Sequence, residues 1–164
     1  MTIRYQEGVQ QVLLNGEDVS GLIRTEEVGN MASAVSGYMP VREKLVELQK
    51  QLAAKENVIM DGRDIGTCVL PDAPAKIYLT ASVEVRAVRR YKELLEKGME
   101  ADLKEIEKDI EDRDYRDMHR EHSPLKQAED AVLLDTSSMT LDQVVEEILK
   151  IVREKGYKAA GGCA

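Results

Sequence analysis

The sequence comprises 164 residues, a length that can bury one hydrophobic core but not two generous ones. Its net charge of −8 opposes nonspecific binding to nucleic acids and to anionic membranes, because both are polyanions that favour a basic surface. Phe and Trp are absent, and neither a signal-peptide pattern nor a long apolar run occurs. With only two distant cysteines, Cys68 and Cys163, the composition indicates a reduced, cytoplasmic protein with no nucleic-acid or membrane partner.

Residues 1–56 predict an antiparallel hairpin followed by two helices. Polar and apolar residues alternate over residues 1–24, where Asn15-Gly16 is typical of a tight turn. A helical pattern runs from Thr25 to about residue 38, and a second pattern begins after Pro40. The second helix has one apolar face, made by Val41, Leu45, Leu48 and Leu52. We interpret residues 1–56 as an excursion from a single domain that extends to residue 157.

Residues 57–157 alternate short apolar strands with helices. Strands are predicted at Val58 to Met60, at residues 76–80 and within "AVLLDTSSMT" at residues 131–140. Strands and helices in alternation are typical of an α/β fold with a parallel sheet, in which ligands bind at the carboxyl ends of the strands. The loops after these strands are therefore the candidate sites, and we assign no role to the tail at residues 158–164.

The helices after the second and third strands carry recognisable start signals. Ser82 is a predicted N-cap for a helix that runs to Gly98. Thr140 and Gln143 have capping-box spacing before a helix that starts at Leu141.

A densely charged segment, "EDRDYRDMHR", occupies residues 111–120. The apolar stripe of the preceding helix consists of Leu103, Ile106 and Ile110. Steps of three and four continue this stripe to Arg113, Asp117 and Arg120, which should face the interior, while Asp112, Asp114, Arg116 and His119 should project toward solvent or the flanks. An Asp between two Arg can hold both guanidinium groups and direct them at phosphate. The alternative is a solvated, salt-bridged helix end.

Two further groups of charged residues lie near predicted strand ends. One is Arg86, Arg89 and Arg90 in "EVRAVRRYKE", and the other is Arg63 with Asp64 in "DGRDIG", where a glycine on each side lets the backbone approach a ligand. The alternatives are ordinary surface arginines and a plain turn. His119 and His122 lack the spacing of a metal site, so no metal ligand is predicted.

Five segments carry a resemblance to a known family. They are "LNGEDVSGLIRTEEV", "ASAVSGYMPVREKL", "MDGRDIGTCVLPDAPAKIYLTAS", "RAVRRYKELLEKG" and "RDYRDMHREHSPLKQAEDAVLLDTSSMT". In this order they resemble the bacterial cytidylate kinase family over residues 3–152. The resemblance implies a P-loop nucleoside monophosphate kinase-like fold, with a parallel sheet, flanking helices and a small antiparallel excursion. It also implies transfer of the γ-phosphoryl group of ATP to CMP or dCMP, with Mg²⁺.

The same resemblance implies a role for each candidate residue. Ser33, Arg42 and Asp64 correspond to the cytosine pocket, Arg63 and Arg120 to ligands of the CMP phosphate, and Arg113 and Asp117 to ligands of the pentose. Arg86 and Arg89, with Arg90 beside them, belong to a mobile lid near residues 86–120 that covers the transferring phosphates. Arg86, Arg89 and Arg120 are therefore the expected catalytic residues.

One family motif does not occur in the sequence. No GxxxxGK[ST] loop is found in the 164 residues, although this loop holds the ATP phosphates and helps to bind Mg²⁺. We therefore expect a chain that starts after the family's first strand and is inactive alone. That strand would lie between those at 58–61 and 76–80. Without it, either these two strands close up, or another chain fills the gap, or the isolated chain is poorly folded, and the exposed sheet edge would also favour self-association. A noncatalytic CMP-binding or protein-interaction module is the alternative function.

Overall fold

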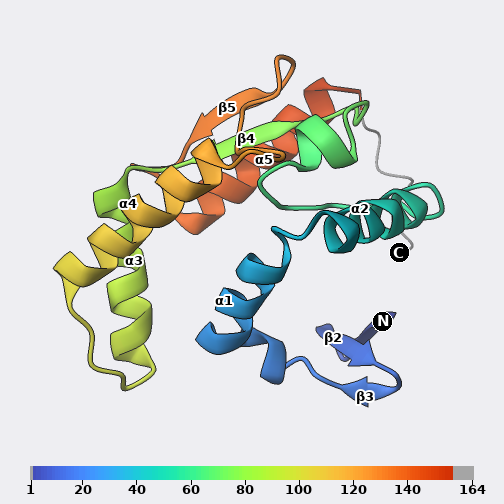
Figure 1. Cartoon of the computed structure of the whole chain (residues 1–164). Helices are drawn as coiled ribbons and strands as arrows, with labels where there is room; N and C mark the ends of the chain where they lie inside the picture. Colours follow the sequence, from blue (N-terminus) through green and yellow to red (C-terminus); the bar gives the residue numbers. More distant parts are fainter. Residues whose placement is uncertain (1, 157–164) are drawn as a thin grey trace. The chain divides into compact units, whose positions relative to one another are not determined.

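The computed structural model describes residues 2–156, apart from the side chains of Glu26, Asn30 and Ser33. The chain forms two compact units, which divide after Glu56 (Figure 1). This division falls at the predicted end of the excursion, and the single domain proposed for residues 1–157 stays a prediction. Cys163 and the tail at residues 158–164 lie outside the described residues.

The first unit begins with a small antiparallel sheet. Its strands are β1 (Thr2–Gln6), β2 (Val9–Leu14) and β3 (Glu17–Asp18), hydrogen-bonded in that order. Two-residue turns at Glu7-Gly8 and Asn15-Gly16 connect them, and all four turn residues have φ between 51° and 93°. Such turns match the twist of paired strands, and Asn and Gly tolerate the positive φ. The hairpin predicted at Asn15-Gly16 is confirmed, while the turn at Glu7-Gly8 was missed.

Helices complete the first unit. A short 3₁₀ turn at Leu22–Arg24 leads into α1 (Glu26–Val35), where the hydroxyl of the N-cap Thr25 accepts a hydrogen bond from Val28 N at 3.4 Å. The next helix, α2 (Met39–Ala53), has a proline in its first turn, where the missing N–H is not needed. The predicted apolar face of α2 is present as a stripe, and its four members are exposed.

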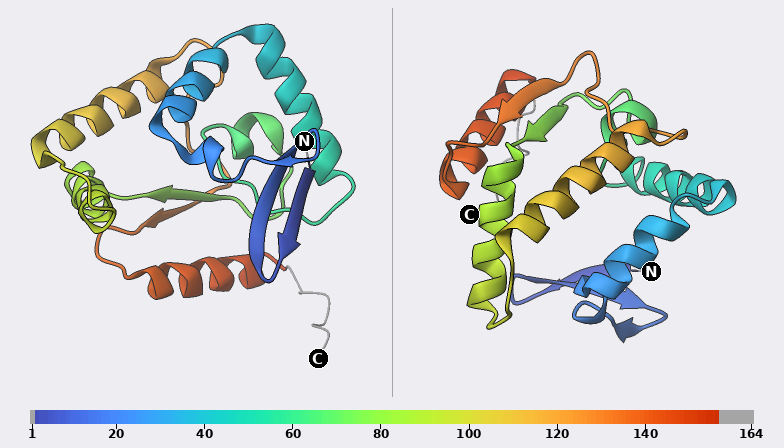
Figure 2. Two further views of the ribbon diagram at one scale, coloured as in Figure 1. Left: turned by 90° about the horizontal axis from the view of Figure 1, so that it is seen from below. Right: turned by 60° about the vertical axis from the view of Figure 1, so that its left-hand side comes forward.

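The second unit is an α/β arrangement around two parallel strands. Its elements, in chain order, are a π-helical turn (Ile65–Val69), β4 (Ile77–Thr80), α3 (Val83–Glu96), α4 (Leu103–His119), β5 (Val132–Asp135) and α5 (Leu141–Glu154). Strands β4 and β5 pair in parallel, with Tyr78 opposite Leu133. In chain order, α3 and α4 lie between β4 and β5, and they pack against each other. Helix α5 lies beside the two strands (Figures 1 and 2). The α/β class and the parallel sheet are confirmed.

The predicted helix signals of this unit are also confirmed. Ser82 Oγ accepts a hydrogen bond from Val85 N at 3.3 Å at the start of α3, and Gly98, with φ of 72°, follows its end. At α5, Thr140 and Gln143 form both hydrogen bonds of the capping box. These caps fix where each helix starts, immediately after the loop at the carboxyl end of a strand.

The strand predicted at Val58 to Met60 is wrong. Residues 57–61 have no regular secondary structure, and Ile59 is fully exposed. A strand needs a neighbour that takes its backbone hydrogen bonds, and β4 pairs only with β5 among residues 2–156. The two predicted strands therefore do not close up, and an apolar run alone does not establish a strand.

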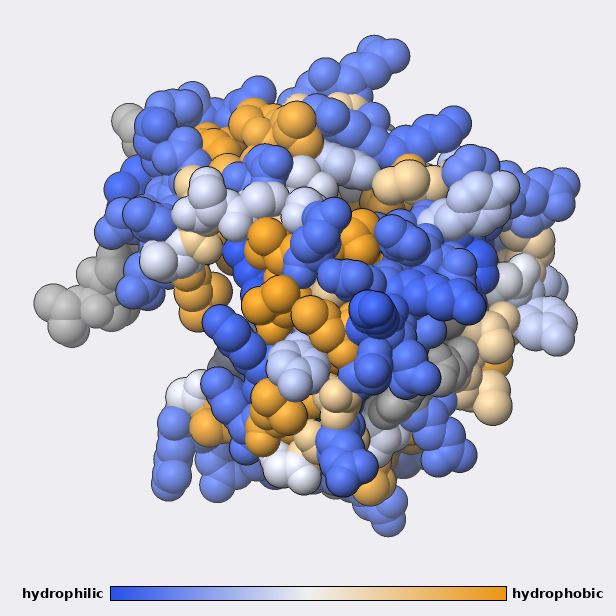
Figure 3. Space-filling view, turned by 90° about the vertical axis from the view of Figure 1, so that its left-hand side faces the viewer, coloured by the Kyte–Doolittle hydropathy of each residue, from blue (hydrophilic) through white to orange (hydrophobic). Residues whose placement is uncertain are grey.

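The buried apolar core belongs to the second unit. Among the described side chains, the buried apolar ones are Val69, Ala81, Ala87, Leu134 and Ile151. This is a small core, and many large apolar side chains stay exposed, so apolar surface appears between the hydrophilic side chains in Figure 3. The buried residues lie just before β4, at the strand ends and on α3 and α5, so they hold the loops at the carboxyl ends of β4 and β5.

Candidate functional site

The "DGRDIG" segment forms a tight turn held by one carbonyl. Asp64 O accepts hydrogen bonds from Cys68 N at 2.8 Å, from Val69 N at 3.2 Å and from Thr67 N at 3.3 Å. A Cβ at Gly62 would lie 2.9 Å from the Ile65 side chain, so this glycine is explained by close packing within the turn. The turn places Arg63 where its side chain reaches α4.

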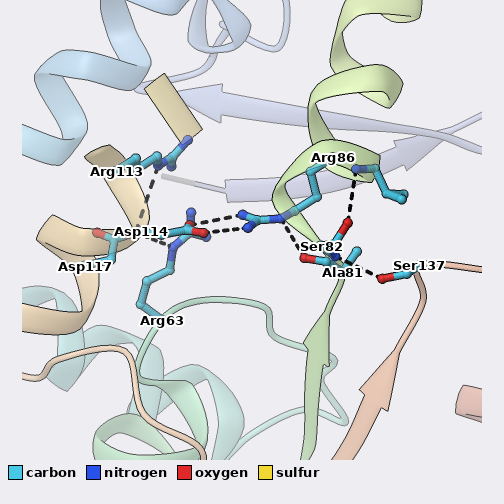
Figure 4. A network of polar contacts seen from close by, with 9 residues as sticks. Arg63, Ala81, Ser82, Arg86, Arg113, Asp114, Asp117 and Ser137 are labelled. Carbon is cyan, nitrogen blue, oxygen red and sulfur yellow. Dashed lines mark hydrogen bonds and ion pairs between the residues drawn. The ribbon is translucent and has the colours of Figure 1, made fainter. Parts of the chain in front are cut away.

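Arg63 reaches a carboxylate on α4. Its Nε donates to Asp117 Oδ2 at 3.0 Å, and Arg113 Nε lies 4.0 Å from the same oxygen (Figure 4). The Asp117 side chain is 17% exposed, so its charge is largely withdrawn from water and is balanced by these two arginines. The predicted trio of Arg113, Asp117 and Arg120 is wrong in two respects. Asp117 pairs with Arg63 and Arg113 and not with Arg120, and Arg113, which was expected to face the interior, is 62% exposed.

Arg120 ends α4 with one unsatisfied nitrogen. Its Nε donates to Ser123 O at 2.7 Å, in a turn where Ser123 has the unusual φ of 48°. Arg120 Nη2 is buried and is the single buried side-chain nitrogen or oxygen without a hydrogen-bond partner in the part of the chain that the structure describes. Buried guanidinium nitrogens are costly without an acceptor, so this group is suited to an anionic ligand.

Arg86 joins α3 to α4 through Asp114. Its Nη1 and Nη2 donate to Asp114 Oδ1 and Oδ2 at 3.1 and 2.6 Å, and its Nε donates to Ala81 O at 2.9 Å. Asp114 was predicted to project toward solvent or a flank, but only 26% of its side chain is exposed. The reason is the helical period, because Asp114 lies four residues after Ile110 and shares the inner face with Asp117.

Arg89 and Arg90 have different surroundings. Arg89 donates to Thr136 O at 2.6 Å, to Thr136 Oγ1 at 3.2 Å and to Met139 O at 3.4 Å, which ties α3 to the loop after β5. Arg90 pairs with Glu93 at 2.9 Å, and both side chains are nearly half exposed. Arg89 therefore lies at the carboxyl end of the sheet, whereas Arg90 forms an ordinary surface ion pair.

A serine links the loops after the two strands. Ser137 Oγ accepts from Ser82 N at 2.9 Å and donates to Asp135 Oδ1 at 2.6 Å. This hydrogen bond, followed by that from Ser137 N, lowers the pKa of Asp135 below its ordinary value of 3.8. The network fixes the start of α3, from which Arg86 and Arg89 project.

The remaining candidate residues lie in other places. Asp64 is half-buried in the second unit, while Ser33 on α1 and Arg42 in the first turn of α2 belong to the first unit. The Ser33 side chain lies outside the described residues. Over residues 2–156, no group of three or more His, Cys, Asp or Glu side chains could hold a metal ion, and no helix is long and apolar enough to cross a membrane.

The ion pairs in Figure 4 define the chemistry available. Three guanidinium groups, those of Arg63, Arg86 and Arg113, share the two carboxylates of Asp114 and Asp117, so the cluster keeps one uncompensated positive charge. Arg120, at the C-terminal end of α4, carries a further positive charge. A parallel sheet flanked by helices, with arginines gathered on one side, fits the class of P-loop nucleoside monophosphate kinase-like proteins.

Comparison with known proteins identifies the family within this class. The family model described as cytidylate kinase matches residues 1–154, and the chain belongs to the cytidylate kinase family. It is 55% identical over 152 residues to a protein of Lactobacillus johnsonii named cytidylate kinase, covering 93% of this chain and 66% of that protein. Proteins of the same name from Ligilactobacillus salivarius and Listeria innocua are 50% and 51% identical, with 92% and 93% of this chain covered, and 67% and 69% of theirs. The chain thus spans about two thirds of the length of the relatives it matches.

Proposed function

We propose that this chain binds CMP or dCMP and provides the monophosphate-binding part of a reaction that transfers a phosphoryl group from ATP to that nucleotide. The observation that carries the proposal is the buried Nη2 of Arg120, which has no acceptor in residues 2–156. A phosphate oxygen would supply that acceptor, and guanidinium groups bind phosphate through two parallel hydrogen bonds.

The phosphate and the pentose would share the arginine and carboxylate cluster. Asp117 holds Arg63 through Nε, which leaves the two Nη groups of Arg63 for the CMP phosphate together with Arg120. We assign Arg113 and Asp117 to the pentose, because a carboxylate accepts and a guanidinium donates hydrogen bonds to sugar hydroxyls.

Recognition of the base would depend on Asp64, Ser33 and Arg42, which rests on the family pattern. The exocyclic amine of cytosine is a donor, so carboxylate and hydroxyl oxygens satisfy it, whereas uracil presents a carbonyl at the same position. The mismatch should cost on the order of 1–3 kcal/mol. We therefore expect preference for CMP over UMP.

Phosphoryl transfer needs cations that neutralise the charge on the phosphoryl oxygens and an in-line arrangement of the two nucleotides. We propose Arg86 and Arg89 as these cations. The N–H groups of Arg86 that Asp114 and Ala81 do not hold would donate to a phosphoryl oxygen, and Arg89 would exchange a protein acceptor for one. ATP, with Mg²⁺, is the second substrate. Over residues 2–156 no three or more His, Cys, Asp or Glu side chains form a group that could hold a metal ion, and the GxxxxGK[ST] motif does not occur in the sequence, so we assign no step to the metal. We expect the 164-residue chain, in a cytoplasmic setting, to bind CMP but to form no CDP by itself.

The test is a thermal melt of the purified chain with excess CMP, with UMP as the control, combined with an assay for CDP in the presence of MgATP. A ligand at about 100 times its dissociation constant stabilises the folded state by about 2.7 kcal/mol, which raises the melting temperature by about 5–10 °C for a chain of this size.

A rise with CMP, a smaller rise with UMP and no CDP are the expected results. No stabilisation by CMP would overturn the proposed binding function. CDP formation by the purified chain would overturn the proposed lack of activity and would require a different site for the ATP phosphates.

A further inference from the structure

The proposed site contains a carboxylate to which the family pattern gives no role. Asp114 binds both Nη groups of Arg86 in the two-pronged geometry that gives the strongest ion pairs, at 3.1 and 2.6 Å. The side chains of Arg86 and Asp114 are 34% and 26% exposed. This pair is therefore better shielded from water than the surface pair Arg90–Glu93, whose side chains are 45% and 46% exposed.

Three hydrogen bonds restrict the orientation of the Arg86 guanidinium. In addition to the two contacts with Asp114, its Nε donates to Ala81 O at 2.9 Å, at the carboxyl end of β4. Three of the five N–H groups of the guanidinium are thus held, and two are left for another acceptor. Asp114 therefore sets the orientation of the two N–H groups that remain.

The position of Asp114 on α4 places Arg86 beside the proposed phosphate ligands. Asp114 lies three residues before Asp117, on the same face of the helix, and Asp117 holds Arg63. Figure 4 shows Arg86 and Arg63 both pointing at these two carboxylates, one from α3 and the other from the turn after residue 61. Arg86 therefore lies beside Arg63, the arginine assigned to the CMP phosphate.

We infer that Asp114 is a positioning residue that aims Arg86 at the phosphoryl group attached to the CMP phosphate. This inference rests on the proposed function. Asp114 itself touches no substrate, and it acts by holding the guanidinium where a second phosphate needs it. Without this carboxylate, Arg86 would keep its charge but would lose its fixed direction, and preorganised direction is what makes a cation effective at a developing charge.

The inference can be tested with the chain as it exists, because CDP carries the second phosphate and CMP does not. The affinities for CMP and CDP are measured by calorimetry for the wild type, Asp114→Asn, Asp114→Glu and the control Asp112→Asn. Asp112 lies on the same helix and its side chain is exposed. We expect Asp114→Asn to bind CDP about tenfold more weakly while its affinity for CMP changes less than about twofold, with partial recovery in Asp114→Glu and no change in the control.

A double variant separates positioning from general stability. In an Arg86→Ala background, Asp114→Asn should have no further effect on CDP binding, because the group that it positions is gone. If Asp114→Asn does not fold, Arg86→Lys supplies the same test, since lysine keeps the charge and loses the planar fork. Wild-type chain that fails to bind CMP would overturn the proposed function. Intact CMP binding with equal losses for CMP and CDP, or with no selective loss for CDP, would overturn the inference alone.

Discussion

Arg120 presents a buried guanidinium nitrogen that has no acceptor within residues 2–156, although its Nε is well bonded to Ser123 O. If that nitrogen binds the CMP phosphate, Arg120→Ala should weaken CMP binding by 10- to 100-fold, as expected for a charged hydrogen bond worth about 1.5–3 kcal/mol. Arg120→Lys should restore little, because lysine cannot present a fork. Calorimetry with CMP provides the measurement, with Arg116→Ala as an exposed control on the same helix. Equal affinities in Arg120→Ala and the wild type would remove Arg120 from the site.

A second residue-scale prediction concerns the ion pair between Lys76 and Asp130. The Lys76 side chain is only 7% exposed, and its Nζ donates to Pro71 O and, at 2.8 Å, to Asp130 Oδ1. The hydrogen bond from Lys76 is the main cause that lowers the pKa of Asp130 below 3.8. A carboxyl group with a lowered pKa in the folded state stabilises the fold above its unfolded pKa, and this contribution is lost as pH falls through the folded pKa.

Asp130→Asn should therefore lower the melting temperature at neutral pH, because the buried ammonium loses its counter-charge. The difference from wild type should shrink as pH falls from about 4 toward the lowered pKa of the folded Asp130, because the wild-type carboxylate becomes neutral over this range. Melting curves from about pH 7 to about pH 3 test this, with Asp72→Asn as an exposed control in the preceding turn. A difference that stays constant across this range would contradict the role of the charge.

At the scale of elements, α3 is attached to the sheet by Arg89, which donates three hydrogen bonds to Thr136 and Met139. Thr136 is 4% exposed, so water cannot readily replace the hydrogen bonds that Arg89 donates to it. We expect Arg89→Ala to reduce the free energy of unfolding by about 1–3 kcal/mol. Arg90→Ala should change it by less than about 1 kcal/mol, because Arg90 forms an exposed pair with Glu93. Urea denaturation compares the two, and equal effects would argue against this anchoring role.

The elements also show what could be predicted from the sequence. Local signals were sufficient for the caps at Ser82 and Thr140 and for the turn at Asn15-Gly16, because each depends on residues within a few positions. The partners of Arg86 and Arg89 lie 28 and 47 residues away, and no periodic pattern specifies such pairs. The inward position of Asp114 agrees with a step of four after Ile110, whereas the step of three leads to Arg113, which is exposed.

The failed strand at Val58 to Met60 has a different cause. Its apolar run is typical of a buried parallel strand, but such a run specifies burial and does not specify which backbone supplies the hydrogen bonds. In the described residues β4 pairs with β5 alone, and residues 57–61 have no regular secondary structure, with Ile59 exposed. Strand formation is thus a property of the sheet as a whole, and the segment alone does not determine it.

At the scale of the whole molecule, β4 has one edge that pairs with no strand in residues 2–156, and Leu79 on this strand is 55% exposed. Unpaired edges with apolar side chains favour pairing with another chain, so we expect the purified protein to self-associate as its concentration rises. Leu79→Lys should weaken this association by at least about tenfold, because a charge on the edge opposes burial. Leu141→Lys, an equal change at an exposed position on α5, should have little effect. Sedimentation velocity over a range of concentrations distinguishes these variants. A protein that is monomeric at every concentration, or equal weakening in both variants, would show that the edge of β4 does not mediate association.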